Sequence, residues 1–94
     1  MDELFHKEMR FQEARDVIDR LIGYRSAWIY EEEHKSEPDQ AQIKKWDEET
    51  SVLYRDRENL KFEDDQIDAV LSKYRPQAIA ERVVFLAQNT KGRD

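Results

Sequence analysis

The sequence predicts an all-α protein: a long antiparallel helical hairpin with two short C-terminal helices packed against it. Apolar residues recur at alternating steps of three and four along residues 11–28 and again along residues 43–60. Charged residues make up 40% of the chain, a proportion typical of long solvent-facing helices. Two glycines and two prolines are too few for the turns of a sheet. Ninety-four residues then correspond to one helical domain, residues 1–94.

The two repeating patterns face each other if the chain folds back near residues 36–38. Both patterns have the spacing of a helix face, and they can be laid against each other in opposite directions without a gap. The expected layers pair Trp28 with Ile43, Leu21 with Thr50, Ile18 with Leu53 and Phe11 with Leu60. This coiled-coil-like pairing is the basis of the predicted hairpin.

The first helix is expected over about residues 3–33. Its apolar arc is about 160° wide, which is more than one neighbouring helix covers. We therefore expect a second contact for this helix, either with the C-terminal helices or with a second copy of the protein. Gly23 costs about 1 kcal/mol relative to alanine inside a helix. The helix either continues through Gly23 or restarts near Ser26, and the apolar stripe from Leu21 to Trp28 favours continuation.

The second helix is expected over about residues 37–61, with Ser36 as its N-cap and Pro38 in its first turn. The acidic run at residues 63–65 suits the start of a third helix, about 65–74. Pro76 is expected to open a fourth helix, about 76–89, and residues 91–94 to form a mobile tail. The fourth helix carries small residues beside two larger apolar ones, which we interpret as its packing face: Ala80, Val83, Val84 and Ala87 beside Ile79 and Leu86.

The loop end of this hairpin would be poorly covered, because two short helices following Leu60 would return near Phe5 and Phe11. Exposed apolar surface commonly marks a protein–protein contact, and aromatic residues and arginine dominate such contacts. Within the hairpin, Arg25 is expected to face Trp46 in a cation–π pair that fixes the register. The predicted partner or dimer contacts are Trp28, Ile29, Tyr30, Ile43, Arg25 and Trp46.

These features favour a non-enzymatic protein–protein interaction module of the adaptor, small-chaperone or inhibitor type, acting as a homodimer. There is no cysteine, which excludes disulfides and thiolate metal sites. No catalytic constellation or cofactor motif is found, so we expect neither an enzyme nor a bound cofactor or metal. The chain has no run of about 20 apolar residues and no secretory pattern at its start, so a cytoplasmic protein is expected.

Two alternatives follow from charge and from histidine spacing. Residues 1–71 carry a net charge of −9, which repels phosphate backbones, but residues 72–94 carry +3. A nucleic-acid-associated regulator would use that basic segment, through Lys73, Arg75, Arg82, Lys91 and Arg93. A metal protein would use the Glu-x-x-His spacings ending at His6 and His34. Those histidines would lie about 42 Å apart on one helix, which argues against a shared site.

Overall fold

A computed structural model describes residues 2–91, and this part of the chain is entirely helical apart from two short connections. The helices are α1 (Asp2–Glu33), α2 (Gln40–Asn59) and α3 (Asp64–Lys91). The predicted all-α class is confirmed. The molecule is elongated, with principal extents of 55 × 29 × 15 Å. Along residues 2–91 no helix combines the length and the apolar character that crossing a lipid bilayer requires.

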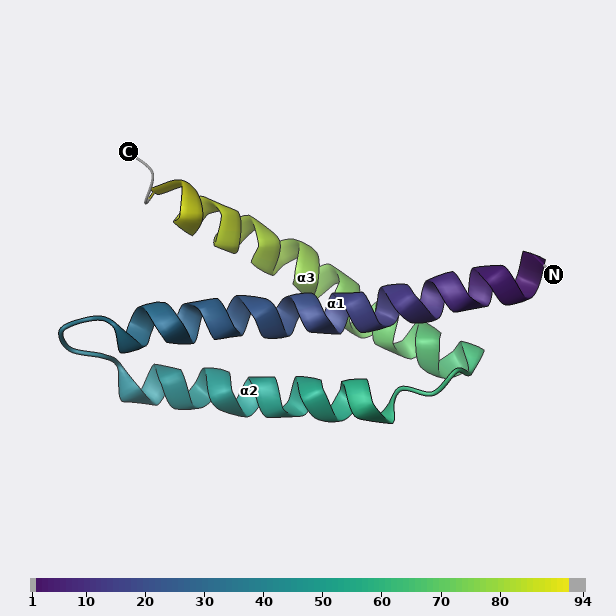
Figure 1. Cartoon of the computed structure of the whole chain (residues 1–94), viewed down its shortest axis with the longest axis horizontal. Helices are drawn as coiled ribbons and strands as arrows, with labels where there is room; N and C mark the ends of the chain where they lie inside the picture. Colours follow the sequence, from purple (N-terminus) through teal and green to yellow (C-terminus); the bar gives the residue numbers. More distant parts are fainter. Residues whose placement is uncertain (1, 92–94) are drawn as a thin grey trace.

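The three helices are arranged around α1. α2 lies beside α1 and runs in the opposite direction, whereas α3 runs in the same direction as α1 and crosses it (Figure 1). Both α2 and α3 pack on α1, and within residues 2–91 they approach each other through side chains and not through close backbone contact. The first turns of α1 extend beyond the end of α2 (Figure 1). α1 is therefore the central helix, on which the other two are placed.

α1 runs without a break through Gly23, as the continuous apolar stripe favours. Its limits, Asp2–Glu33, agree with the predicted 3–33. Gly23 is exposed, and a Cβ built at this position meets no atom within 4 Å. The backbone of Gly23 is helical and its φ is not positive. Among the described residues, no contact or backbone strain therefore requires glycine at this position.

α2 begins later than the sequence predicted, because Asp39 and not Ser36 is its N-cap. The Asp39 side chain accepts a hydrogen bond from the backbone N–H of Gln42 at 3.1 Å. The backbone N–H of Asp39 donates to Oε2 of Glu32 at 3.0 Å, which ties the end of α1 to the start of α2. Aspartate caps a helix as well as serine does, and Pro38 then lies just before the cap. The predicted 37–61 is corrected to Gln40–Asn59.

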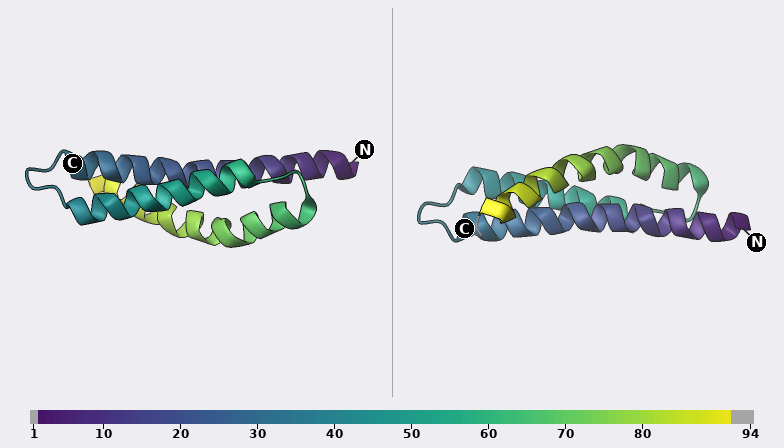
Figure 2. Two further views of the ribbon diagram at one scale, coloured as in Figure 1. Left: turned by 90° about the horizontal axis from the view of Figure 1, so that it is seen from below. Right: turned by 90° about the horizontal axis from the view of Figure 1, so that it is seen from above.

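The two predicted C-terminal helices, 65–74 and 76–89, are one helix. α3 passes through Pro76, which lacks the N–H for a helical hydrogen bond and usually kinks or ends a helix. Pro76 is exposed on the outer side, and α3 curves along its length (Figure 2). Its buried side chains continue in register across Pro76, from Tyr74 to Ala78, so packing on α1 holds the helix together. α3 ends at Lys91, and the rest of the expected tail lies outside the described residues.

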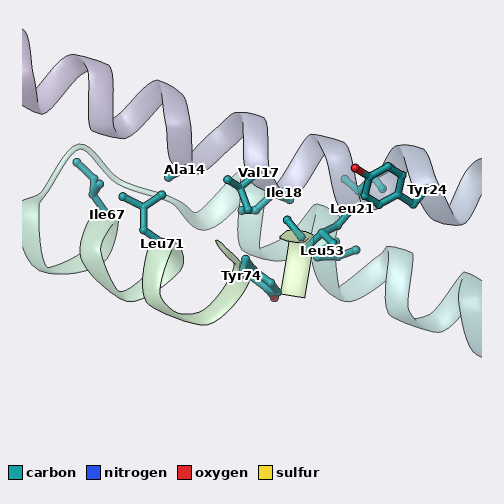
Figure 3. Close-up of a cluster of buried hydrophobic side chains, with 11 residues drawn as sticks. Ala14, Val17, Ile18, Leu21, Tyr24, Leu53, Ile67, Leu71 and Tyr74 are labelled. Carbon is teal, nitrogen blue, oxygen red and sulfur yellow. The ribbon is translucent and has the colours of Figure 1, made fainter. Parts of the chain in front are cut away.

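The core is formed where α3 and α2 meet the buried face of α1 (Figure 3). Ile18, Leu21 and Ile67 are its largest fully buried side chains. α1 contributes most of the cluster, α3 adds its inner face, and α2 adds Leu53. The core residues are Ala14, Val17, Ile18, Leu21, Ile22, Tyr24, Leu53, Ile67, Leu71, Tyr74 and Ala78.

Contacts between α1 and α2 lie about one helical turn from the expected pairing near the loop. The Trp28 ring contacts Trp46, three residues beyond the expected Ile43 (ring centroids 5.8 Å apart). Arg25 pairs with Glu49, three residues beyond the expected Trp46. Ile18 and Leu53 do belong to the same core cluster. Large aromatic and arginine side chains extend along the neighbouring helix by about one turn. A prediction that pairs positions layer by layer does not account for this reach.

Replacing Gly23 with alanine should stabilise the protein. Alanine restricts the unfolded chain and is favoured inside a helix by about 0.5–1 kcal/mol, and no neighbouring atom opposes its methyl group. Urea denaturation followed by tryptophan fluorescence should show a higher midpoint with an unchanged slope. A lower midpoint would indicate that α1 is not continuous at this position.

The Glu32 carboxylate should make the α1–α2 connection sensitive to acid. The backbone N–H of Asp39 and the ammonium of Lys35 hold the pKa of Glu32 below its ordinary value of 4.5. This stabilisation is present above the unfolded pKa and is lost as the pH falls through the lower, folded pKa. We expect Glu32→Gln to be less stable than wild type at pH 7, and the difference to shrink below pH 4.5. A difference that stays constant from pH 7 to pH 3 in urea denaturation would contradict this role.

Candidate protein-binding surface

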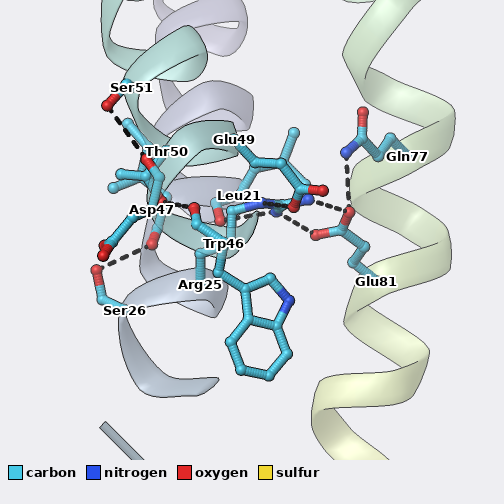
Figure 4. A network of polar contacts seen from close by, with 11 residues as sticks. Leu21, Arg25, Ser26, Trp46, Asp47, Glu49, Thr50, Ser51, Gln77 and Glu81 are labelled. Carbon is cyan, nitrogen blue, oxygen red and sulfur yellow. Dashed lines mark hydrogen bonds and ion pairs between the residues drawn. The ribbon is translucent and has the colours of Figure 1, made fainter. Parts of the chain in front are cut away.

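Arg25 of α1 joins all three helices, through Glu49 of α2 and Glu81 of α3 (Figure 4). Its side chain is almost completely buried on the inner face of α1. Nε donates to Glu49 of α2 at 3.0 Å. The two terminal nitrogens donate to the two carboxylate oxygens of Glu81 of α3, at 2.6 and 2.9 Å, and one of them also donates to the backbone carbonyl of Leu21 at 3.2 Å. The guanidinium is thus bound by both neighbouring helices.

The charge of Arg25 is stabilised by these two carboxylates. Burial lowers the pKa of the Arg25 guanidinium, but the hydrogen bonds and negative charges of Glu81 and Glu49 outweigh burial, and the pKa is raised. Gln77 donates a further hydrogen bond to Glu81 at 2.8 Å, one turn earlier on α3. This bond orients the carboxylate toward α1. The two parallel hydrogen bonds between the Arg25 guanidinium and the Glu81 carboxylate make this a bidentate ion pair. This planar geometry gives arginine its specificity for carboxylates.

An aromatic cluster surrounds this ion pair toward the loop end of the hairpin. The centroid of the Tyr24 ring lies 4.9 Å from that of Phe85 and 6.2 Å from that of Trp28, and the Trp28 ring in turn contacts Trp46. The Arg25 guanidinium lies over Trp28, at 5.8 Å from the ring centre, and not over the Trp46 ring with which we expected it to pair. Because α3 is one long helix, Phe85 reaches and covers part of the end that two short helices would have left open.

The six predicted contact residues therefore differ in their accessibility. Arg25 and Ile43 are buried inside the chain, and Trp28, Ile29 and Trp46 are half-buried. Tyr30 is exposed, with its ring 4.0 Å from that of His34. The structure brings Arg25, Trp28 and Trp46 together, but as packing within one chain.

A different group of apolar side chains is strongly exposed, and we call it the outer strip. It consists of Phe5 and Met9 of α1, exposed by 59% and 56%, and of Ile79 and Val83 of α3, exposed by 63% and 65%. Met9 and Ile79 line the same surface hollow, whose polar neighbours include Gln12. Phe5 lies one helical turn before Met9, and Val83 one turn after Ile79, so the four side chains follow one side of the molecule.

The charges beside the outer strip change sign along it. Its α1 end is the start of α1, where the carboxylates Asp2, Glu3 and Glu8 outnumber the one cation, Lys7. At its α3 end, Arg82 lies beside Val83, and Arg20 lines the hollow together with Ile79. Between the ends, Nε of Arg75 donates to Glu13 at 3.0 Å and links α3 to α1. The remaining members of the hollow are Gln12, Asp16, Val17 and Ala78.

A second hollow, of about 310 Å³, lies between α2 and α3. Its walls include Leu60 and Val70, and the Tyr74 hydroxyl donates across it to Asp56. Burial and this hydrogen bond raise the pKa of Tyr74. Among the residues described around this hollow, the titratable ones are Asp56, Lys73 and Tyr74, and these three are paired with one another. The hollow marks the gap between the backbones of α2 and α3, which the hydrogen bond from Tyr74 to Asp56 spans.

The basic residues of the nucleic-acid alternative do not form one surface of free charge. Lys73 is 3.4 Å from Asp56, and Arg75 is paired with Glu13. Arg82 lies on the far part of α3. The side chain of Lys91 and the whole of Arg93 lie outside what the structure describes. Two of the five cations are thus already engaged by carboxylates of α2 and α1.

The two histidines lie near opposite ends of α1 and do not share a site. Nδ1 of His34 lies 2.7 Å from the carbonyl oxygen of Tyr30, and His6 is in the second turn of α1, beside Phe5. Within residues 2–91 no group of three or more histidine, aspartate or glutamate side chains is arranged to hold a metal ion.

Comparison with protein families, with curated proteins and with solved structures finds no match to this chain. Two features of the surface were missed from the sequence. Glu81 was one charged residue among many, and only the position of α3 pairs it with Arg25. Ile79 and Val83 were assigned to a packing face, although their spacing of four also fits an outward-facing pair.

Replacing Glu81 with glutamine should weaken the attachment of α3. The change leaves the buried Arg25 guanidinium with Glu49 as its remaining carboxylate, and hydrogen bonds between charged groups contribute about 1.5–3 kcal/mol. We expect a loss of about 1–3 kcal/mol in the free energy of unfolding, measured by urea denaturation. Glu48→Gln removes the same charge from an exposed position on α2 and should change stability by less than about 0.5 kcal/mol. Equal effects of the two changes would contradict the role of Glu81.

Proposed function

We propose that this chain is a non-enzymatic protein–protein interaction module, of the adaptor, small-chaperone or inhibitor type, and that it binds through the outer strip. The observation that carries the proposal is the exposure of four large apolar side chains, each by more than half, along one side of the molecule. Exposed apolar surface of this kind marks interaction sites in soluble proteins. Burying one such side chain contributes about 1.5–3 kcal/mol.

The outer strip has no evident role in the fold of the chain itself. α3 already contributes its inner face to the core, through Ile67, Leu71 and Tyr74. Ile79 and Val83 lie on the other side of the same helix, where they add to solvent-exposed surface. Apolar residues at these positions are therefore better explained by a contact outside the chain than by internal packing.

The strip is favoured over the loop end as the binding surface because of what each region already contacts. Arg25 and Ile43 are buried within the chain, and Trp28 and Trp46 pack against one another. Of the residues first proposed, Tyr30 keeps a largely exposed ring. We place it at the margin of a contact and the outer strip at its centre.

The double substitution Ile79→Ser, Val83→Ser tests this proposal. Both side chains are exposed, so the free energy of unfolding should change little, and any association of the protein should weaken by about tenfold or more. The matched control is Val52→Ser, Tyr54→Ser, which removes two exposed apolar side chains from α2, outside the strip. Association is measured in two ways: self-association by sedimentation equilibrium, and retention of proteins from an extract of the native cell by the immobilised chain.

The proposal predicts that the strip variant loses the association that wild type and control share. If the strip variant and the control associate equally, or if wild type shows no association by either measurement, the proposal is wrong. Circular dichroism of all three proteins establishes that the helices are intact.

A further inference from the structure

We infer that the outer strip is covered by a second copy of this chain, in an antiparallel twofold arrangement. In it, Phe5 and Met9 of one copy cover Val83 and Ile79 of the other, and the reverse contact forms at the other end. The inference rests on the proposed function, because it names the occupant of the same surface. It is supported by the course of the strip, by its charges and by the shape of α1.

The strip has two ends that a twofold axis can exchange. α3 runs in the same direction as α1 (Figure 1). Because Arg75 pairs with Glu13, Phe5 and Met9 precede this pair along α1, and Ile79 and Val83 follow it along α3. The Glu13–Arg75 ion pair lies between the two halves. A twofold axis near this pair places Met9 opposite Ile79 and Phe5 opposite Val83 of the second copy. Each apolar side chain then meets another apolar side chain.

The charges favour this orientation over the opposite one. Twofold contacts require a surface that is complementary to itself. The Phe5 end carries Asp2, Glu3 and Glu8 against the single cation Lys7, and the Val83 end carries Arg82 and Arg20 against the single carboxylate Asp16. Antiparallel copies bring the acidic end of one against the basic end of the other, whereas parallel copies would bring like charges together. The excess charge is negative at the Phe5 end and positive at the Val83 end, and the antiparallel pairing sets opposite excess charges against each other at both ends.

The shape of α1 makes the contact accessible. Its first turns extend beyond α2 (Figure 1), and the start of α3 is tied to α1 at Arg10, which pairs with Asp64 and Asp68. Phe5 lies about one and a half turns before Arg10, where α1 projects from the body. A second copy can therefore approach Phe5 without displacing α2 or α3.

The absence of native cysteine allows a direct test by disulfide cross-linking. Phe5→Cys and Val83→Cys are made in separate chains of different mass, mixed and oxidised, and the products are resolved by intact mass spectrometry. A disulfide requires Cα atoms within about 7 Å, so we expect the mixed product, which joins position 5 of one chain to position 83 of the other, to exceed either self-linked product by about fivefold or more. The matched control mixes Val83→Cys with Tyr54→Cys, whose exposed position lies on α2, and should stay at the background level.

The outcomes separate this inference from the proposed function. Preferential self-linking of the Val83→Cys chain would overturn the antiparallel arrangement, as would a mixed yield no higher than that of the Tyr54→Cys control. If wild type sediments as a monomer but the strip variant loses retention of other proteins, the second copy is excluded and the binding function stands. If the strip variant changes no association and the mixed cross-link is at background, both proposals are wrong.

Discussion

A single buried guanidinium joins the three helices and completes the apolar packing of α2 and α3 on α1. Arg25 extends from α1 and binds Glu49 of α2 and both carboxylate oxygens of Glu81 of α3. α2 and α3 have little direct contact, so apart from the Tyr74 and Lys73 contacts with Asp56 their relative placement is set through α1. Buried ion pairs often contribute more to the choice of one arrangement than to total stability, because desolvation offsets much of their attraction. Here the ion pair lies on the same face of α3 as the buried Ile67, Leu71 and Tyr74, and acts with them to turn that face inward.

The rotation of α3 determines the outer strip. Ile79 and Val83 each lie two residues from Glu81, and two residues correspond to about 200° around a helix. With Glu81 held toward Arg25, both side chains turn away from the buried face of α3, and they are the most exposed of the large apolar residues that the structure describes. The buried network and the proposed binding surface are two sides of the same helix. The affinity of a partner for the outer strip would therefore depend on the Arg25–Glu81 ion pair, although the partner does not contact either residue.

Periodicity alone was sufficient for the helical class, for the limits of α1 and for its continuity through Gly23. It failed at Pro76, because the rule that proline ends a helix is local, whereas the inner face of α3 is continuous from Ile67 to Phe85 and packs along α1. The start of α2 was missed for a similar reason. Asp39 and Ser36 are both good caps, and the choice depends on Glu32, which the structure brings to the Asp39 N–H.

The candidate surface was harder to predict than the fold. Arg25 stood out as a charge within an apolar stripe, but its partner on α3 could not be identified while α3 was divided at Pro76. With α3 divided, the loop end of the hairpin was expected to be uncovered, and Trp28 and Ile43 were therefore predicted as partner contacts. For the same reason, Ile79 and Val83 were predicted to pack within the chain. One wrong helix boundary thus moved the expected surface from one side of the molecule to the other.

The most direct test of this account is a double-mutant cycle between Arg25→Met and Glu81→Gln, with the free energy of unfolding measured by urea denaturation. If Arg25 holds α3 through Glu81, the two changes should be coupled by at least about 1 kcal/mol. A coupling energy within about 0.3 kcal/mol of zero would show that α3 is placed without this ion pair, and would contradict the account.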